Sequence, residues 1–153
     1  MNNKKYKKLA VGGTFDKFHK GHEKLLETAI CYGDHIEVGV TSDKFGGLKG
    51  DIDPCNERFS NLNLFLHNNN ANFHIMELND RFGTTITEKD FNAIVVSEET
   101  EPTAIEINNI RKKNNMPLLD IIVVSFVLAD DGTPISSTRI RKGEINKTGQ
   151  LIH

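Results

Sequence analysis

Short apolar segments alternate along this chain with segments of helical spacing, and this order constrains the fold more than any other feature. The strand-like segments span residues 7–11, 35–40, 73–78, 93–97 and 121–129. The helix-like segments cover residues 20–32, begin again at Asp53-Pro54 and at Thr100-Glu101-Pro102, and end with residues 136–142. This alternation predicts an α/β fold of the Rossmann-like, doubly wound kind, in which a parallel five-stranded sheet has helices on both faces. In such a sheet the ligand site lies beyond the carboxyl ends of the strands, near the first strand.

The length and composition suit one globular domain over residues 1–153. Of the 153 residues, 37% are hydrophobic and 26% are charged, which is ordinary for a globular fold. The formal net charge of -2 argues against a dedicated nucleic-acid binder, which usually carries a basic excess. No apolar run reaches the length of a membrane span. We therefore expect no nucleic-acid partner and no membrane partner.

Localisation follows from the N-terminal segment and from the cysteines. The apolar stretch Leu9-Ala10-Val11 is too short for the hydrophobic region of a signal peptide. Cys31 and Cys55 lie far apart, without the spacing of a zinc site or a disulfide framework. Reduced thiols are typical of the cytoplasm, so we expect a cytoplasmic protein. A monomer is compatible with the sequence, which leaves the oligomeric state open.

The strongest local signal is a glycine- and histidine-containing segment between the first strand and the first helix. It reads Gly12-Gly13-Thr14-Phe15-Asp16-Lys17-Phe18-His19-Lys20-Gly21-His22. A helix N-terminus offers free backbone N–H groups and a positive dipole end, and glycines let the backbone approach a phosphate. Histidines three residues apart lie on the same side of a helical turn, so both can donate to one phosphate through Nε2. The segment therefore predicts a phosphate site.

Other interpretations of this segment fit less well. The G-x-G-x-x-G fingerprint of dinucleotide-binding proteins and the G-K-S/T of a P-loop are both missing. His22 begins a sequence like that of zinc proteases, but Leu26 stands where the second histidine belongs. Metal ligation by His19 and His22 has no evident third ligand, so we expect no metal site made of side chains. A purely structural alternative remains, in which the two histidines only cap a helix.

Two segments far apart in the sequence resemble the signatures of one superfamily. Residues 13–22 are similar to the G-T-F-D-x-x-H-x-G-H motif of the nucleotidyltransferases, which include adenylyl- and cytidylyltransferases. Near the end, Ile135-Ser136-Ser137-Thr138-Arg139-Ile140-Arg141 resembles their I-S-S-T-x-I-R motif. Hydroxyls and guanidinium groups at a helix N-terminus suit the β- and γ-phosphates of ATP. The alternative is a serine-capped helix with a solvated basic face.

The middle of the chain narrows the resemblance, which covers about residues 8–143. Residues 94–100 (IVVSEET), 106–111 (EINNIR) and 38–44 (VGVTSDK) look like the archaeal and eukaryotic type of phosphopantetheine adenylyltransferase. Pro54 and Arg58 fit the same group, whereas Phe18 stands where leucine is more usual. The chain carries no segment for a fused kinase domain, which points to the stand-alone archaeal form.

The resemblance implies transfer of AMP from ATP to 4′-phosphopantetheine, giving dephospho-coenzyme A and pyrophosphate in coenzyme A biosynthesis. It assigns catalysis to His22, His19, Thr14 and Lys44, with Thr14 and Lys44 also holding the acceptor. It assigns ATP binding to Gly13, Thr14, Phe15, His22, Arg111, Ser136, Ser137, Thr138 and Arg141. Asp16 is expected to be structural, accepting backbone N–H bonds in the turn. Mg²⁺ is expected to arrive with ATP, whose phosphates supply most of its ligands.

Several alternatives stay open at this stage. A glycerol-3-phosphate cytidylyltransferase, an FMN adenylyltransferase or a nicotinamide mononucleotide adenylyltransferase would share the first motif. A nucleotide-binding regulator without catalysis is a candidate of a different class. Lys44 also fits a solvated lysine, and Arg111 also fits a surface arginine on a helix.

Overall fold

The computed structural model describes residues 5–46 and 53–152, and its main elements follow the predicted order. The strands are β1 (Tyr6–Gly13), β2 (Gly33–Thr41), β3 (Phe73–Leu78), β4 (Ala93–Ser97) and β5 (Asp120–Val124). The helices are α1 (Lys20–Tyr32), α2 (Asp43–Gly46), α3 (Cys55–Asn68), the 3-10 helix η2 (Gly83–Ile86), α4 (Glu101–Lys113) and α5 (Ser137–Arg141).

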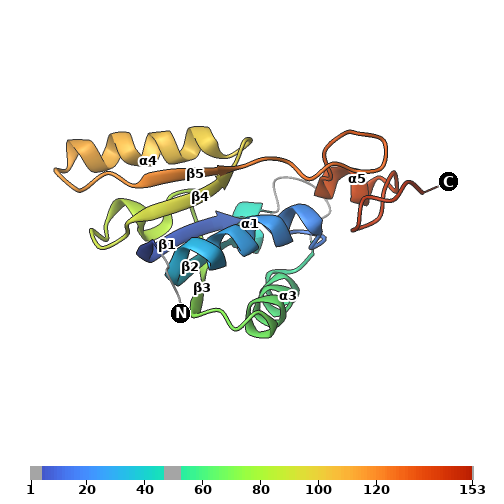
Figure 1. The fold of residues 1–153 in the computed structure, drawn as a ribbon, viewed down its shortest axis with the longest axis horizontal. Coiled ribbons are helices and arrows are strands. Elements are labelled where there is room, and N and C mark those ends of the chain that lie inside the picture. Colours follow the sequence, from blue (N-terminus) through green and yellow to red (C-terminus); the bar gives the residue numbers. More distant parts are fainter. Residues whose placement is uncertain (1–4, 47–52, 153) are drawn as a thin grey trace.

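The five strands form one sheet in which all neighbours run parallel. Their spatial order is β3-β2-β1-β4-β5. The chain thus winds outward from β1 to β3 and then returns to the other side of β1 to form β4 and β5. The direction of winding reverses between β1 and β4, which confirms the doubly wound sheet and the position expected for the first strand. Figure 1 shows α5 at the end of the molecule toward which β1 and β5 point.

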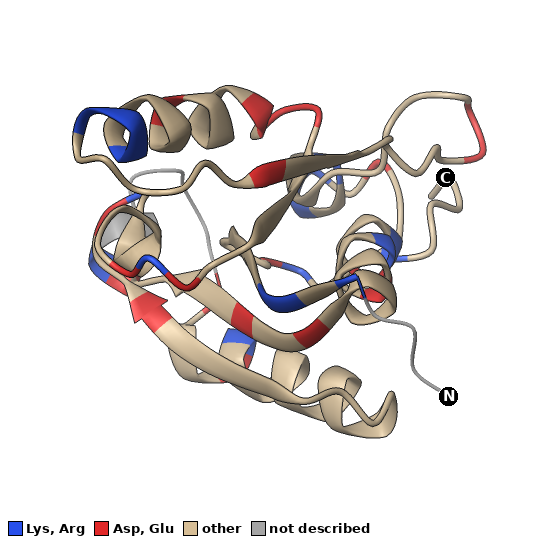
Figure 2. Ribbon diagram, turned by 60° about the vertical axis from the view of Figure 1, so that its left-hand side comes forward, with Lys and Arg blue, Asp and Glu red and all other residues tan. Residues whose placement is uncertain are grey.

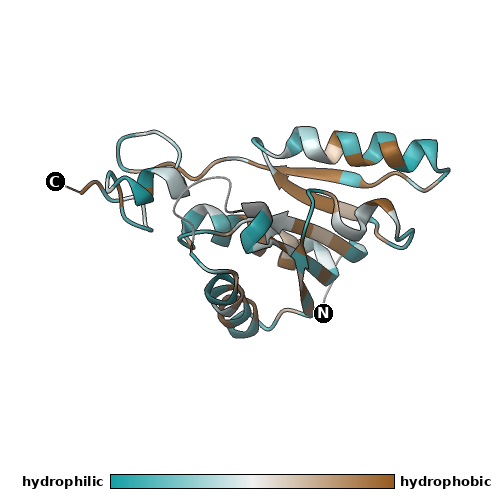
Figure 3. Ribbon diagram, turned by 180° about the vertical axis from the view of Figure 1, so that it is seen from behind, coloured by the Kyte–Doolittle hydropathy of each residue, from teal (hydrophilic) through white to brown (hydrophobic). Residues whose placement is uncertain are grey.

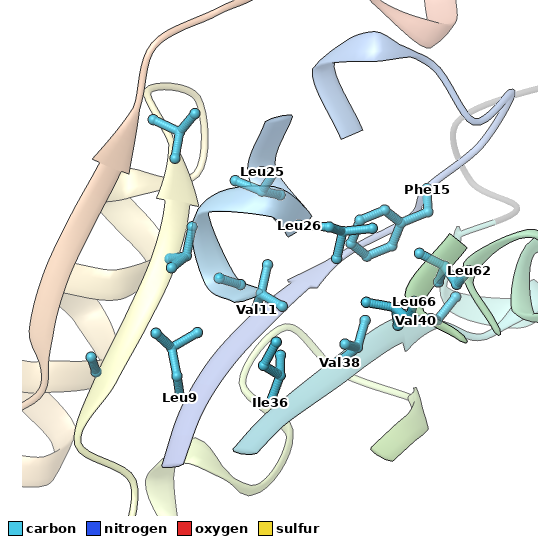
Figure 4. Packing of buried hydrophobic residues seen from close by; sticks show 14 of the residues in the cluster. Leu9, Val11, Phe15, Leu25, Leu26, Ile36, Val38, Val40, Leu62 and Leu66 are labelled. Carbon is cyan, nitrogen blue, oxygen red and sulfur yellow. The ribbon is translucent and has the colours of Figure 1, made fainter. Parts of the chain in front are cut away.

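Helices α1 and α3 cover one face of the sheet. Side chains alternate along each strand, so every second residue of a strand points toward these helices. Leu9 and Val11 of β1 are fully or almost fully buried on this face, as is Val38 of β2. They pack against Leu26 of α1 and Leu62 of α3, and Figure 4 shows these side chains gathered between the two helices and the sheet. This cluster fixes α1, and with it the first turn of α1, on β1.

The opposite face has a separate and smaller core under α4 and η2. Ile94 and Val96 of β4 alternate with the residues of the first cluster and meet Ala104 and Ile107 of α4. Figure 3 shows brown apolar strands between helices of mixed hydropathy. Among the helices in the described ranges, none is both long enough and apolar enough to cross a membrane.

Several element ends differ from the predicted ones. β5 ends at Val124 instead of residue 129, because the chain leaves the sheet and Leu128 pairs with Pro134 in an isolated antiparallel bridge. Helix α4 ends at Lys113, and Asn114 is its C-cap residue. The short helices α2 and η2 were not predicted, since four residues are too few to show a helical period.

Gly33 ends α1 and does so in extended backbone. Its φ of -103° and ψ of 130° start β2 directly, without the left-handed residue that often ends a helix. A small residue is needed there because a Cβ on Gly33 would lie 2.9 Å from Cβ of Leu9. Close packing of α1 and β2 on β1 therefore explains this glycine.

Candidate active site

A cleft of about 800 Å³ opens at the carboxyl ends of the strands, where the winding of the sheet reverses. Both signature segments line it: Thr14, His19 and His22 from the first, and Ser137 and Arg141 from the second. Ends of β2, β3 and β4 form other parts of its wall. The prediction that the ligand site lies beyond the carboxyl ends of the strands, near β1, is consistent with this cleft.

The two histidines stack on each other at the first turn of α1. Their ring centroids are 3.7 Å apart and the ring planes differ by 18°. His19 is the N-cap residue, and its Nδ1 accepts the backbone N–H of Gly21 at 3.0 Å. Nδ1 of His22 accepts the backbone N–H of His19 at 3.2 Å. Because each Nδ1 is an acceptor, the proton of each neutral ring sits on Nε2, which is left to donate to a ligand.

Burial keeps both imidazoles uncharged. Removal from solvent lowers the pKa of His19 to about 4, although the nearby Asp16 carboxylate acts in the opposite direction. Burial also lowers the pKa of His22 well below its ordinary value, and the neighbouring His19 adds to this effect. At neutral pH the pair is therefore two N–H donors without net charge, and protonation on Nδ1 would break the bonds that orient the rings.

Gly21 and two phenylalanines hold the histidine rings in place. A Cβ on Gly21 would lie 2.8 Å from Cε1 of His19, so only glycine leaves room for this ring. The ring centroids of Phe15 and Phe18 lie 5.3 and 5.7 Å from that of His22. The spacing of the H-x-G-H segment thus follows from the packing of one helical turn.

The loop between β1 and α1 has an unusual backbone. Phe15 and Lys17 have φ values of 53° and 51°, in the left-handed region that costs free energy for residues other than glycine. Asp16, between them, is almost completely buried, and its Oδ1 accepts the backbone N–H of Asp53 at 2.8 Å. The predicted structural role of Asp16 agrees with this hydrogen bond.

Asp16 also joins the two signature segments, which are 125 residues apart at this contact. Its Oδ2 accepts a hydrogen bond from the Arg141 guanidinium at 2.5 Å, and its backbone carbonyl accepts one from Ser137 Oγ at 2.6 Å. Arg141 further donates to Oγ1 of Thr138 at 3.1 Å. Helix α5 is thereby fixed beside the loop between β1 and α1.

Comparison with known proteins agrees with this arrangement. Residues 10–143 match the family model described as cytidylyltransferase-like. The chain belongs to this family. It is 53% identical over 150 residues to the phosphopantetheine adenylyltransferase of Methanothermobacter thermautotrophicus, with 97% of this chain and 92% of that protein covered. It is 45% identical over 148 residues to the protein of that name from Methanopyrus kandleri, with 94% and 93% covered.

A solved structure shares the fold of this family member. The crystal structure of a protein with unknown function from Archaeoglobus fulgidus superposes with a TM-score of 0.72 at 27% sequence identity. The match covers 95% of this chain and 99% of that one. The arrangement of strands and helices is therefore one that a relative adopts over its full length.

The predicted site residues of this family member do not all lie at the cleft. Gly13, Phe15, Ser136 and Thr138 line it together with the residues already named. The side chain of Phe15 is buried in the core, which leaves its backbone for any ligand contact. Oγ of Ser136 is the N-cap acceptor of α5, bound to the backbone N–H of Arg139 at 3.2 Å. Lys44 is exposed on α2, just after the carboxyl end of β2, and is not among the described residues that line the cleft.

Arg111 corrects a prediction, because the structure does not place it at the cleft. Its side chain is completely buried beneath η2 and the segment that follows. Nε donates to the carbonyl of Pro117 at 2.7 Å, and Nη1 donates to those of Thr85 and Glu88 at 2.6 and 3.0 Å. A guanidinium committed to backbone carbonyls has a structural role, so we remove Arg111 from the ATP-binding set.

Sequence reasoning missed much of the cleft wall on the side of β2 and β3. Met76 and Leu78 of β3, Arg81, Phe82 and Thr84 line this part. The available signal was positional, since a parallel strand that ends near the first motif brings its last residues to the same edge. Among the described residues, no group of three histidines, cysteines, aspartates or glutamates is placed to hold a metal ion.

Proposed function

We propose that this chain transfers AMP from ATP to 4′-phosphopantetheine, releasing pyrophosphate and dephospho-coenzyme A. Its curated relatives with this function in their names match it over nearly their whole length at 45–53% identity. The observation that carries the proposal is the stacked pair His19 and His22, whose Nδ1 atoms are both occupied and whose Nε2 atoms are left to donate. The reaction belongs to coenzyme A biosynthesis.

The chemistry needs little more than orientation and stabilisation of charge. The acceptor phosphate is already ionised, so no strong general base is required. One of its oxygens forms a bond to the α-phosphorus of ATP. The bond from that phosphorus to the β-phosphate oxygen breaks, and pyrophosphate leaves with the electron pair. Neutral N–H donors fixed on the α-phosphate stabilise the charge that develops there, without needing to reorient during the reaction.

The acceptor is proposed to lie on the β2 side of the histidines. Thr14 lines the cleft at the end of β1 and offers its hydroxyl and backbone N–H between the acceptor phosphate and the α-phosphate. Lys44 follows the neighbouring strand β2, and its long side chain is proposed to reach the acceptor phosphate from α2. The partly apolar wall around Met76 and Leu78 would then take the organic part of the acceptor.

The β- and γ-phosphates are proposed to bind at the first turn of α5. Ser137, Thr138 and Arg141 line the cleft there, and Arg141 is held in place by the carboxylate of Asp16. Gly13 and Phe15 are proposed to contribute backbone contacts, because Gly13 has no side chain and that of Phe15 is buried. Mg²⁺ is proposed to enter with the nucleotide, with oxygens of the phosphates and water as its ligands.

The setting proposed for this reaction is the cytoplasm, without nucleic acid or membrane. Cys31 and Cys55 are both free thiols in the described chain, as the cytoplasm favours. The net charge is -2, and Figure 2 shows residues of both signs along the helices and strands. Such a mixed distribution does not form the basic stripe of a nucleic-acid binder.

The test is pyrophosphate release from ATP and Mg²⁺ with 4′-phosphopantetheine as acceptor. Parallel reactions contain CTP with glycerol 3-phosphate, ATP with FMN, and ATP with nicotinamide mononucleotide. We expect release only with 4′-phosphopantetheine, with dephospho-coenzyme A as the product. Release only in another reaction would show that the acceptor is not 4′-phosphopantetheine. ATP binding without release in any of them would show a regulator instead of an enzyme.

A further inference from the structure

Arg58 of α3 is completely buried at the carboxyl ends of β1 and β2, and all three guanidinium nitrogens are bound. Nε donates to the carbonyl of Asp53 at 2.8 Å. Nη1 donates to the carbonyls of Thr14 and Thr41 at 3.0 and 2.7 Å. Nη2 forms an ion pair with Oδ1 of Asp43 at 3.1 Å. One side chain therefore connects three separate segments of the chain.

Two of these segments carry the residues assigned to the acceptor phosphate. Thr14 is bound to Arg58 through its own carbonyl, and Lys44 follows Asp43 directly in α2. Asp43 is held a second time, because its Oδ1 also accepts the backbone N–H of Cys55 at 2.7 Å. The separation of Thr14 and α2 is thus set by a rigid planar fork bound to both.

We propose that Arg58 is a positioning residue for the reaction, which sets Thr14 and Lys44 at the separation that an acceptor phosphate requires. Its side chain has no exposed surface, so it acts through its neighbours and does not touch the substrate. The proposal rests on the proposed adenylyl transfer to 4′-phosphopantetheine. Most groups assigned to ATP do not contact Arg58, since His19 and His22 are held by backbone N–H groups and Arg141 by Asp16. Thr14 is assigned to both substrates, and it is the residue of the ATP set that Arg58 contacts.

The chain contains a matched control in Arg111. This second arginine is also completely buried and also donates to backbone carbonyls, but it lies under η2 on the opposite face of the sheet. Replacing either arginine by lysine keeps the charge and removes the planar fork. The two variants should therefore lose similar stability, while only Arg58 is bound to the segments that carry Thr14 and Lys44.

The experiment measures steady-state pyrophosphate release and ATP affinity for the wild type, R58K and R111K, at a temperature where all three are folded. For R58K we expect kcat to fall roughly 10–100-fold, because small displacements of reacting groups cost about this much. We also expect its KM for 4′-phosphopantetheine to rise several-fold, and its Kd for ATP, measured by calorimetry, to stay within about threefold of the wild type. R111K should keep both kinetic constants within about threefold.

Three outcomes would overturn the proposal. They are an unchanged kcat and acceptor KM in R58K, an equal loss of affinity for ATP and acceptor, and the same kinetic loss in R111K. If R58K does not fold, D43N gives the same test, because the carboxylate of Asp43 is 66% exposed and pairs with Arg58. D43N should show a smaller fall in kcat than R58K, with a higher KM for 4′-phosphopantetheine and a nearly unchanged Kd for ATP. If D43N shows no such effect, the proposal is also overturned. A wild type inactive with 4′-phosphopantetheine would instead refute the proposed function.

Discussion

At the residue scale, the hydrogen-bond partner of one ring atom determines what each active-site histidine offers. A neutral imidazole has one donor and one acceptor nitrogen, and a backbone N–H at Nδ1 assigns the donor to Nε2. In His19 and His22 this backbone N–H comes from the same helical turn, so the folding of α1 also sets the tautomers. The pair therefore needs no additional side chain to orient it, unlike histidines held by a carboxylate.

Replacement of His22 tests this role. His22→Ala should lower kcat by roughly 10²–10³-fold, the scale for loss of one donor to the transition state. Pyrophosphate release at saturating ATP and acceptor measures it. His67→Ala is the control, since His67 is exposed in the last turn of α3 and should leave kcat unchanged. Activity of His22→Ala within a few-fold of the wild type would remove His22 from the mechanism.

Arg141 allows a second prediction at this scale. Arg141→Ala should weaken ATP binding by about tenfold or more, because a charge-assisted contact to phosphate and its preorganisation by Asp16 are both lost. The KM for 4′-phosphopantetheine should change much less. Lys142→Ala removes the same charge from the neighbouring exposed position and should bind ATP normally. Calorimetric titration with ATP compares the two, and equal affinities would contradict the phosphate assignment.

The sequence pointed to the histidines and to the serine-arginine segment, because each resembles a nucleotidyltransferase signature and lies at the start of a predicted helix. It did not separate Arg111 from a ligand-binding arginine, although a signal was available. Arg111 falls on the same helical stripe as Ala104 and Ile107, and all three are buried in α4. Arg58 shares a stripe with Leu62 and Leu66 of α3 in the same way. An arginine on an apolar stripe has to find backbone acceptors inside the fold, and which carbonyls it finds depends on tertiary structure.

At the scale of elements, the first turn of α1 has to be helical and also has to hold the imidazole rings of His19 and His22 in place. Its order H-x-G-H places glycine where helix propensity disfavours it, at a cost of about 1 kcal/mol relative to alanine. The structure gives the reason, since a side chain at Gly21 would overlap the ring of His19. The end of β5 was beyond sequence reasoning, because the chain leaves the sheet to form the bridge between Leu128 and Pro134.

Substitution of Gly21 separates the effect of this residue on helix stability from its effect on activity. Gly21→Ala should displace the His19 ring and lower kcat by tenfold or more, because the two Nε2 atoms then no longer point at one phosphate. The neighbouring variant Lys20→Ala changes an exposed residue of the same turn and should keep its activity. Pyrophosphate release and thermal unfolding are measured for both. A fully active Gly21→Ala would show that the ring position seen here is not required.

At the scale of the whole molecule, the reversal of strand order between β1 and β4 creates the cleft and brings the two signature segments together. Residues 125 apart meet there through Asp16, so the site exists only when the whole sheet has formed. Stability and activity are therefore linked through the buried histidines. Groups that must stay neutral inside the fold become charged in the unfolded chain as the pH falls.

Stability should therefore depend on pH between about 6.5 and 4. An unfolded histidine titrates near 6.5, whereas burial lowers the pKa of His19 to about 4 in the folded protein. Between these values the unfolded chain binds a proton that the native state does not, so the free energy of unfolding falls as the pH is lowered. Above pH 6.5 this loss is absent. The slope should approach about 1.4 kcal/mol per pH unit for each such histidine, and His22 adds to it with the same sign.

Urea unfolding at several pH values from 7.5 to 4.5 measures this dependence, and His19→Asn isolates the part due to His19. Asparagine is a good N-cap residue and does not titrate, so the variant should keep its stability at pH 7.5 and lose less on acidification. The carboxylates of Asp53, Glu88 and Asp131 have lowered pKa values, and their stabilisation starts to be lost as the pH falls below about 5. The variant keeps these carboxylates, so the difference between the two slopes reports on His19. Identical slopes for the variant and the wild type would contradict a buried, neutral His19.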